Sequence, residues 1–96
     1  MISTELKDKS LWIYISDTFT IDNFNEFQAA HQNADYDDIV IDFSNTQHID
    51  SGGLGMLLQL RTQLGEDADK ITLHSPTDSV RKIFEIVNFD KLFHVA

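Results

Sequence analysis

Residues 48–58 read HIDSGGLGMLL and hold three of the four glycines in a chain of 96 residues. Each glycine inside a helix costs about 0.8–1.0 kcal/mol relative to alanine, so the cluster needs a physical reason. It lies between an apolar segment, DIVIDF at 38–43, and a leucine pattern that runs to about residue 65. This arrangement is typical of a buried strand that turns sharply into an amphipathic helix.

Further strands are predicted on both sides of this junction. Residues 11–15, LWIYI, combine β-branched and aromatic side chains and predict a strand, which a DKS turn joins to an edge strand in ISTELK. Residues 38–43 have an unbroken apolar centre, which predicts a strand covered on both faces of the sheet. KITLHS at 70–75 returns to a strand pattern, so four strands are expected.

Three helices are predicted between and after these strands. Residues 20–32 carry four side chains at helical spacing that are expected to face inward: Ile21, Phe24, Phe27 and His31. The second helix runs from residue 51 to about residue 65, and the third follows SPTD at 75–78 and stops at Asn88. The predicted fold is α/β in one domain over residues 1–96, a mixed four-stranded sheet with helices packed on it in the order β-β-α-β-α-β-α. The strands flanking the second helix should be parallel.

Charge and composition limit the classes of partner. The net charge is −9, from 16 acidic and 7 basic residues, so the chain repels phosphate backbones and anionic membranes. Neither nucleic acid nor a membrane is therefore expected as a partner. The chain has no cysteine, no basic leader followed by an apolar run and no long apolar segment, which indicates a cytoplasmic protein. Whether the acidity attracts a basic partner or only maintains solubility stays open.

The glycines occupy different sides of the second helix. On a helical wheel with Ser51 as N-cap, Gly53 lies inward, where it would allow the helix to approach the sheet closely. Gly52 and Gly55 fall on the outer side, where no packing argument requires a glycine, so something else is expected to approach there. A phosphate on Ser51 would add a charge of about −1.5 to −2 at a helix start that tolerates it. A simple N-cap with a tight turn explains the same residues, and both interpretations stay open here.

The hexapeptide DSGGLG at 50–55, after IVIDF and before MLLQL, resembles the phosphorylation-site signature of the STAS domain family, of the anti-sigma factor antagonist type. The resemblance extends to VRKIFEIVNFDKLFHV at 80–95, which is similar to the last helix and closing segment of the family. It implies a STAS fold and a partner-switching protein. The resemblance further implies that Ser51 is phosphorylated by a serine kinase that also acts as an anti-sigma factor, and dephosphorylated by a PP2C-type phosphatase. The unphosphorylated protein would bind its partner and the phosphorylated protein would release it.

The predicted partner-binding face combines the signature with the outer side of the helix: Asp50, Ser51, Gly52, Gly55, Met56, Leu58, Gln59 and Thr62. Asp50 matches the aspartate of the family and would either orient the Ser51 hydroxyl or form an Asx-type turn. Gly52 stands where many relatives carry a second serine or threonine. The chain departs from the family at DTFT, residues 17–20, because Thr20 takes the place of the aspartate in a Gly-Glu-hydrophobic-Asp pattern.

An enzyme is not expected. A hydrolase with Ser51 as nucleophile requires Gly-x-Ser-x-Gly, and Ile49 occupies the position of the first glycine. His48 precedes the serine by only three residues, an order unlike that of known triads. GGLG lacks the spacing and the lysine of a nucleotide-binding loop, and the histidines have no metal-ligand spacing. No catalytic residue, cofactor or metal is therefore predicted.

A second function uses the same fold. Some stand-alone STAS proteins, which this chain resembles in length, are unphosphorylated subunits that bind the ATPase of a lipid-transport ABC complex, with the same loop and helix as a permanent interface. Such relatives also carry a double glycine in this loop. Genomic neighbours would distinguish the two, and a homodimer is left open in both.

Overall fold

The N-terminal residues form a β-hairpin with a two-residue turn. β1 (Ile2–Lys7) and β2 (Ser10–Phe19) pair antiparallel, with Lys7 opposite Ser10. Asp8 and Lys9 have φ angles of 49° and 74°. Positive φ at both central residues belongs to a type I′ turn, whose twist matches that of the strands. The predicted hairpin is confirmed, with a second strand longer than the LWIYI segment.

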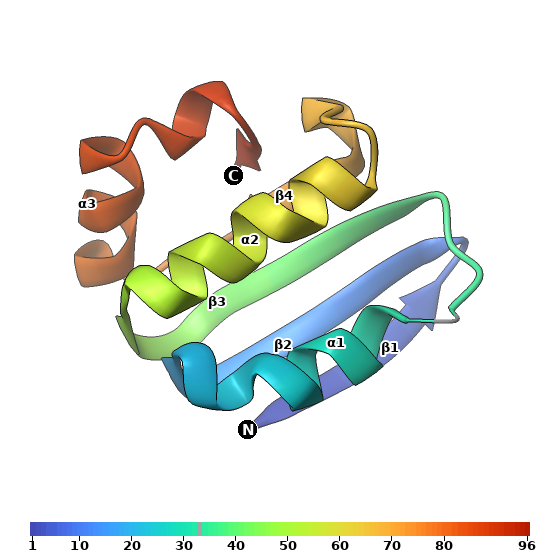
Figure 1. The fold of residues 1–96 in the computed structure, drawn as a ribbon, viewed down its shortest axis with the longest axis horizontal. Helices are drawn as coiled ribbons and strands as arrows, with labels where there is room; N and C mark the ends of the chain where they lie inside the picture. Colours follow the sequence, from blue (N-terminus) through green and yellow to red (C-terminus); the bar gives the residue numbers. More distant parts are fainter. Residues whose placement is uncertain (33) are drawn as a thin grey trace.

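The computed structural model describes residues 1–32 and 34–96. After the hairpin, the remaining elements follow in chain order in Figure 1: η1 (Ile21–Asn23), α1 (Phe24–His31), β3 (Asp38–Ile49), α2 (Ser51–Gln63), η2 (Ala68–Lys70), β4 (Ile71–His74), α3 (Asp78–Ile86), η3 (Phe89–Lys91) and β5 (His94–Val95).

The strands form one mixed sheet in the order β1-β2-β3-β4-β5. β1 and β2 are antiparallel and the other neighbouring strands are parallel, which confirms the parallel pair on either side of α2. The α/β class is confirmed, but the sheet has five strands and not the predicted four. β5 has only two residues, and two residues are too few to show an alternating pattern.

The helices α1 and α2 lie side by side in front of the sheet in Figure 1. The sheet face beneath them is closed by buried side chains from three strands: Leu11, Ile13, Ile15, Ile39, Ile41, Phe43, Ile71 and Leu73. Leu57 and Leu60 of α2 and Phe84 of α3 complete this core. Because each of these strands alternates buried and less buried residues, only one face of the sheet is fully covered.

The opposite face of the sheet is only partly covered, so the prediction that residues 38–43 are covered on both faces is wrong. Val40, on this face, is half-buried. Its cross-strand neighbour is Trp12, and Lys7 Nζ lies over the Trp12 ring at 4.5 Å from the ring centroid. The rings of Trp12 and His74 pack edge to face, with their centroids 5.2 Å apart. Side chains of the sheet therefore shield the apolar strand without a second helical layer.

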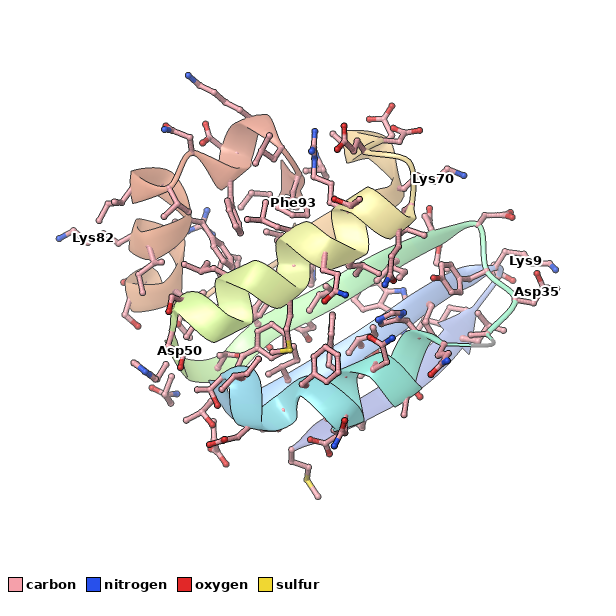
Figure 2. All side chains as sticks on the ribbon, in the orientation of Figure 1. Lys9, Asp35, Asp50, Lys70, Lys82 and Phe93 are labelled. Atoms are coloured by element: carbon pink, nitrogen blue, oxygen red, sulfur yellow. The ribbon has the colours of Figure 1, made fainter. Side chains whose placement is uncertain are left out.

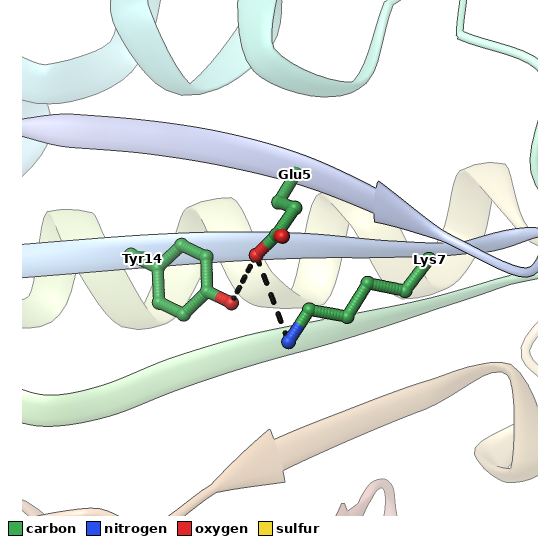
Figure 3. A network of polar contacts seen from close by, with 3 residues as sticks. All are labelled: Glu5, Lys7 and Tyr14. Atoms are coloured by element: carbon green, nitrogen blue, oxygen red, sulfur yellow. Dashed lines mark hydrogen bonds and ion pairs between the residues drawn. The ribbon is translucent and has the colours of Figure 1, made fainter.

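A small polar network lies beside this aromatic cluster. Figure 3 shows it in front of the strands, with the helices behind them. The hydroxyl of Tyr14 donates to Glu5 Oε1 at 3.0 Å, and Lys7 Nζ lies 3.6 Å from the same oxygen. Exposed ion pairs of this kind contribute little stability, so the network mainly orders the surface of the β-hairpin.

The segment at 20–32 differs from the single helix that its spacing predicts. It opens with the 3₁₀ turn η1 before α1 begins. Phe27 and His31 are buried as predicted, whereas Ile21 is 59% and Phe24 36% exposed. A 3₁₀ turn has 3.0 residues per turn and not 3.6, so it rotates Ile21 out of the inner face of α1.

The start of α3 is attached to the centre of the sheet. The hydroxyl of Thr77 donates to the carbonyl oxygen of Thr46 at 2.8 Å, and the Thr46 hydroxyl donates to the carbonyl of Ile15 at 2.7 Å. At the other end, Asn88 has a left-handed φ of 61°, which confirms it as the stop after α3. These contacts place α3 beside the end of β3 that leads into α2.

Candidate functional site

The junction between β3 and α2 is capped by Asp50 and not by Ser51. Asp50 has an extended backbone, and its Oδ1 accepts a hydrogen bond from the amide of Gly53 at 2.9 Å. The prediction of Ser51 as N-cap is therefore wrong, because the carboxylate one residue earlier makes the bond. Ser51 becomes the first helical residue and is exposed. Figure 2 shows Asp50 at this end of α2.

Gly53 allows α2 to lie directly on the end of β2. A Cβ atom at this position would lie 2.2 Å from the carbonyl oxygen of Phe19 and 2.9 Å from the side chain of Ile49. No side chain fits in that space without moving the backbone. The predicted role of Gly53 in close packing of helix and sheet is confirmed.

The other two glycines of the signature have different surroundings. A Cβ at Gly52 would meet Cβ of Ile21 at 2.8 Å, so the prediction that packing does not require this glycine is wrong. A Cβ at Gly55 would have nothing within 4 Å, as its outward position predicts. Gly52 therefore seats η1 against α2, whereas Gly55 leaves open space on the surface.

The outer side of α2 continues from Ser51 toward the end of the helix. Gly55, Leu58, Gln59 and Thr62 are exposed, and the Thr62 hydroxyl donates to the carbonyl of Leu58. Met56, which was predicted as part of the binding face, is only 4% exposed and belongs to the core. The structure thus places Ser51 and four of its predicted neighbours on one surface and turns Met56 inward.

Thr20 has a structural function at the edge of this site. Its hydroxyl accepts a hydrogen bond from the amide of Asp22 at 3.3 Å, and its own amide donates to Asn23 Oδ1 at 2.9 Å. These bonds form a capping box that closes η1 and holds Ile21 over Gly52. The residue that replaces the family aspartate therefore shapes the site through the backbone.

The end of β2 contains an unusual backbone conformation. Asp17 has a φ of 68°, and the pairing of β2 with β3 shifts register on both sides of it. Asp17 stands where the resembling pattern begins with glycine, the residue that adopts this conformation without steric cost. The conformation of Asp17 was not predicted from the sequence, although the glycine in the family pattern is a signal that indicates it.

A shallow crevice between α1 and α2 was also missed. Phe24 and Gln28 from α1 and Met56, Gln59 and Gln63 from α2 contribute to its lining. It adjoins the predicted face through Gln59 and is too narrow to admit a water molecule. The helical spacing predicts Phe24 on the buried side of its helix, so the crevice could not be expected from the sequence.

The remaining candidates for chemistry are His48 and the residue types that bind metal ions. His48 is exposed on β3, opposite Thr18 of β2. Over residues 1–32 and 34–96, no group of three or more acidic or histidine side chains could hold a metal ion. None of the helices in the same residues is both long and apolar enough to cross a membrane.

Comparison with known protein families assigns this chain to a family. A family model described as "Mlab, STAS domain" matches residues 2–94. The chain therefore belongs to the STAS domain family.

The matched relatives are bacterial. A STAS-domain containing protein of Pseudomonas aeruginosa is 42% identical over 57 residues, which cover 59% of this chain and 56% of the relative. An anti-sigma-B factor antagonist of Staphylococcus aureus is 24% identical over 98% of this chain and 90% of its own length.

The fold matches that of a solved relative. The anti-sigma factor antagonist SpoIIAA from Bacillus, in its unphosphorylated form, superposes with a TM-score of 0.78 over 100% of this chain and 88% of its own. At 19% identity, this match shows the fold alone. SpoIIAA and the staphylococcal relative are both named as anti-sigma factor antagonists.

Proposed function

We propose that this chain is an anti-sigma factor antagonist that exchanges partners through Ser51. In its unphosphorylated state it binds a regulator that is both an anti-sigma factor and a serine kinase, and the phosphorylated state releases that regulator. A PP2C-type phosphatase restores the binding state. The names of the staphylococcal relative and of SpoIIAA support the class of partner.

The position of Ser51 is the observation that carries this proposal. Ser51 is exposed at the first residue of α2, and its hydroxyl is not needed for the helix cap because Asp50 provides it. A kinase can therefore reach the hydroxyl without opening the helix. A phosphate at a helix start interacts favourably with the helix dipole, so the modified protein keeps its fold.

The charge of the surrounding surface explains how a phosphate would act as a switch. Arg61 is the only ionised side chain of α2, and its Nε donates to the carbonyl of Leu92, away from Ser51. Apart from the capping carboxylate of Asp50, the outer face of α2 is thus uncharged, and a partner that fits it buries mostly apolar and neutral polar groups. A phosphate of charge about −1.5 to −2 would lose its hydration in that contact without a compensating partner.

The test uses three variants and the partner itself. Tagged Ser51→Ala protein is used in the native cells to recover the bound regulator, which is identified by mass spectrometry and purified. Calorimetric titration should show that Ser51→Ala binds like the unphosphorylated parent and that Ser51→Asp binds at least tenfold more weakly. Ser79→Asp, which adds the same charge to an exposed serine near the start of α3, should leave the affinity unchanged. Equal affinity of Ser51→Asp and Ser51→Ala contradicts the proposal.

A second function is the unphosphorylated subunit of a lipid-transport ABC complex. The observation that favours it is the matching family model, whose description is "Mlab, STAS domain" and does not name an antagonist. In this function the same face of α2 forms a permanent contact with the transport ATPase. Co-purification of that ATPase with both Ser51→Ala and Ser51→Asp would support the subunit and exclude the switch.

A further inference from the structure

The face of the sheet opposite the helices carries a group of aromatic rings. Trp12 and Tyr14 of β2 are stacked with their ring centroids 6.0 Å apart, and His74 of β4 meets the Trp12 ring edge to face. All three side chains are partly exposed, and Figure 3 views this face with the helices behind the strands. We call Trp12, Tyr14 and His74 the ring platform.

A cation of the chain itself lies on this platform. Lys7 Nζ is 4.5 Å from the centroid of the Trp12 ring, within the range of a cation–π interaction. It also lies 3.6 Å from Glu5 Oε1, and the Lys7 side chain remains 47% exposed. An exposed ammonium on a flexible side chain is held weakly, so a cation from another molecule can replace it on the ring. The contact shows which kind of group the ring accepts.

Carboxylates lie beside the ring platform. Asp42 of β3 stands between Tyr14 and His74, which are its cross-strand partners on either side. Neighbouring strands are about 4.8 Å apart, so the Asp42 carboxylate borders both rings. Where β1 to β4 run side by side, the charged side chains of this face are three carboxylates and one ammonium: Glu5, Asp38, Asp42 and Lys7. The face is therefore acidic as well as aromatic, and the net charge of −9 adds to its attraction for a cation.

We propose that this face binds an arginine side chain on a basic segment of a partner protein, with the guanidinium stacked on Trp12 in place of Lys7 and paired with Asp42. A guanidinium is planar and less strongly hydrated than an ammonium, so it stacks on an aromatic ring and donates two parallel hydrogen bonds to a carboxylate. Trp12 and Asp42 provide these two kinds of contact on adjacent strands. Ser51 lies on α2, on the other side of the sheet, so this contact does not depend on the proposed function and leaves the switch accessible.

The first test uses the fluorescence of Trp12, which is the only tryptophan of the chain and therefore reports on the ring platform directly. The purified protein is titrated with three synthetic peptides of equal length, in which glycine alternates with arginine, lysine or glutamate. The arginine peptide should change the fluorescence to saturation and should bind more weakly in added salt, the lysine peptide should bind less tightly, and the glutamate peptide should not bind. The proposal is overturned by no saturating change with the arginine peptide, by equal binding of either other peptide, or by a change on dilution of the protein alone, which would assign the face to a second copy.

Variants titrated by calorimetry with the arginine peptide locate the contact. Asp42→Asn should weaken binding by up to about fivefold, the size expected for an exposed charge pair. Asp22→Asn is the matched control, because it removes the same charge from η1, which packs against α2 on the other side of the sheet. Lys7→Ala should strengthen binding by about two- to fivefold, because it clears the Trp12 ring, whereas Lys82→Ala on α3 should not.

Trp12→Leu removes the stacking surface and should weaken binding by about two- to fivefold. Circular dichroism verifies the fold, and Asp42→Asn and Lys7→Ala test the face even if Trp12→Leu fails to fold. Equal weakening in Asp42→Asn and Asp22→Asn, or equal affinity of Lys7→Ala and Lys82→Ala, would overturn the proposal. The titrations contain neither the regulator nor phosphate, so their failure leaves the switch at Ser51 unaffected.

Discussion

Ile21 lies so close to Gly52 that a Cβ atom added to this glycine would meet Cβ of Ile21 at 2.8 Å. The contact joins η1 to the first turn of α2, immediately beside Ser51. It explains why Ser51 is followed by glycine in this chain and not by the second serine or threonine of the resembling signature. It also leaves Ser51 as the one hydroxyl residue in the DSGGLG signature.

Substitution of Gly52 by alanine should destabilise the fold, because the new methyl group displaces Ile21 and the backbone of η1. Overpacking of this kind costs about 1–3 kcal/mol in free energy of unfolding. Gly55→Ala is the matched control in the same helix, since it meets no atom within 4 Å and should stabilise the protein by up to about 1 kcal/mol. Urea unfolding of both variants measures the difference, and a shift of the same sign in both would contradict the account of these glycines.

Replacement of Asp50 by alanine removes the cap of α2 and should cost about 0.5–2 kcal/mol in free energy of unfolding. Asp50→Asn should cost much less, because its amide oxygen can still accept the hydrogen bond from Gly53. Thermal or urea unfolding compares the two variants. Equal destabilisation would show that Asp50 acts through its charge and not through the cap.

Glycine at position 17 should stabilise the protein slightly. Asp17 holds a φ of 68°, a conformation that is costly for residues with a side chain and free for glycine, so Asp17→Gly should gain up to about 1 kcal/mol. Thr18→Gly, at the next position of β2, which is also exposed, should instead lose about 0.5–1 kcal/mol. The urea concentrations at the midpoint of unfolding should move in opposite directions for Asp17→Gly and Thr18→Gly. A loss of stability in both variants would exclude strain at Asp17.

His31 should make the fold sensitive to acid. Burial lowers the pKa of His31 below its ordinary value of 6.5, because its ring packs against Phe27 in a largely apolar setting. Above pH 6.5 the imidazole is neutral in both the folded and the unfolded chain. As the pH falls below 6.5 the unfolded chain takes up the proton first, so the free energy of unfolding decreases until the folded-state pKa is passed.

The measurement for His31 is the free energy of unfolding of parent and His31→Gln between neutral and acidic pH. The variant should lose less stability than the parent over this range, and His94→Gln at an exposed position should behave like the parent. Parallel curves for parent and His31→Gln would show that burial of His31 does not contribute to acid sensitivity.

The elements that follow strong periodic patterns could be predicted from sequence. The strand at 38–43 and the helix after it follow from the apolar run and the leucine spacing, and Gly53 follows from the helical wheel. These features depend on the local sequence pattern and on the packing of a single helix against the sheet. β5 could not be predicted in this way, because its two residues form a strand only by pairing with β4.

The site was harder to predict where two local signals competed. Asp50 and Ser51 are both good N-cap residues, and only the folded structure shows that Asp50 accepts the hydrogen bond from Gly53. Ile21 fits the helical spacing of its segment, yet the capping box of Thr20 draws it into a 3₁₀ turn. Met56 was predicted in the binding face, whereas it is only 4% exposed and lines the crevice between α1 and α2.

Phosphate mapping on Ser51 is the measurement that tests the central claim most directly. The protein is isolated from its native cells under two growth conditions and analysed by intact mass and by fragmentation. The proposed switch predicts one phosphate, located on Ser51, whose occupancy changes between the conditions. A protein that never carries phosphate on Ser51, in cells where its partner is active, would contradict the switch and favour the permanent subunit of a transport complex.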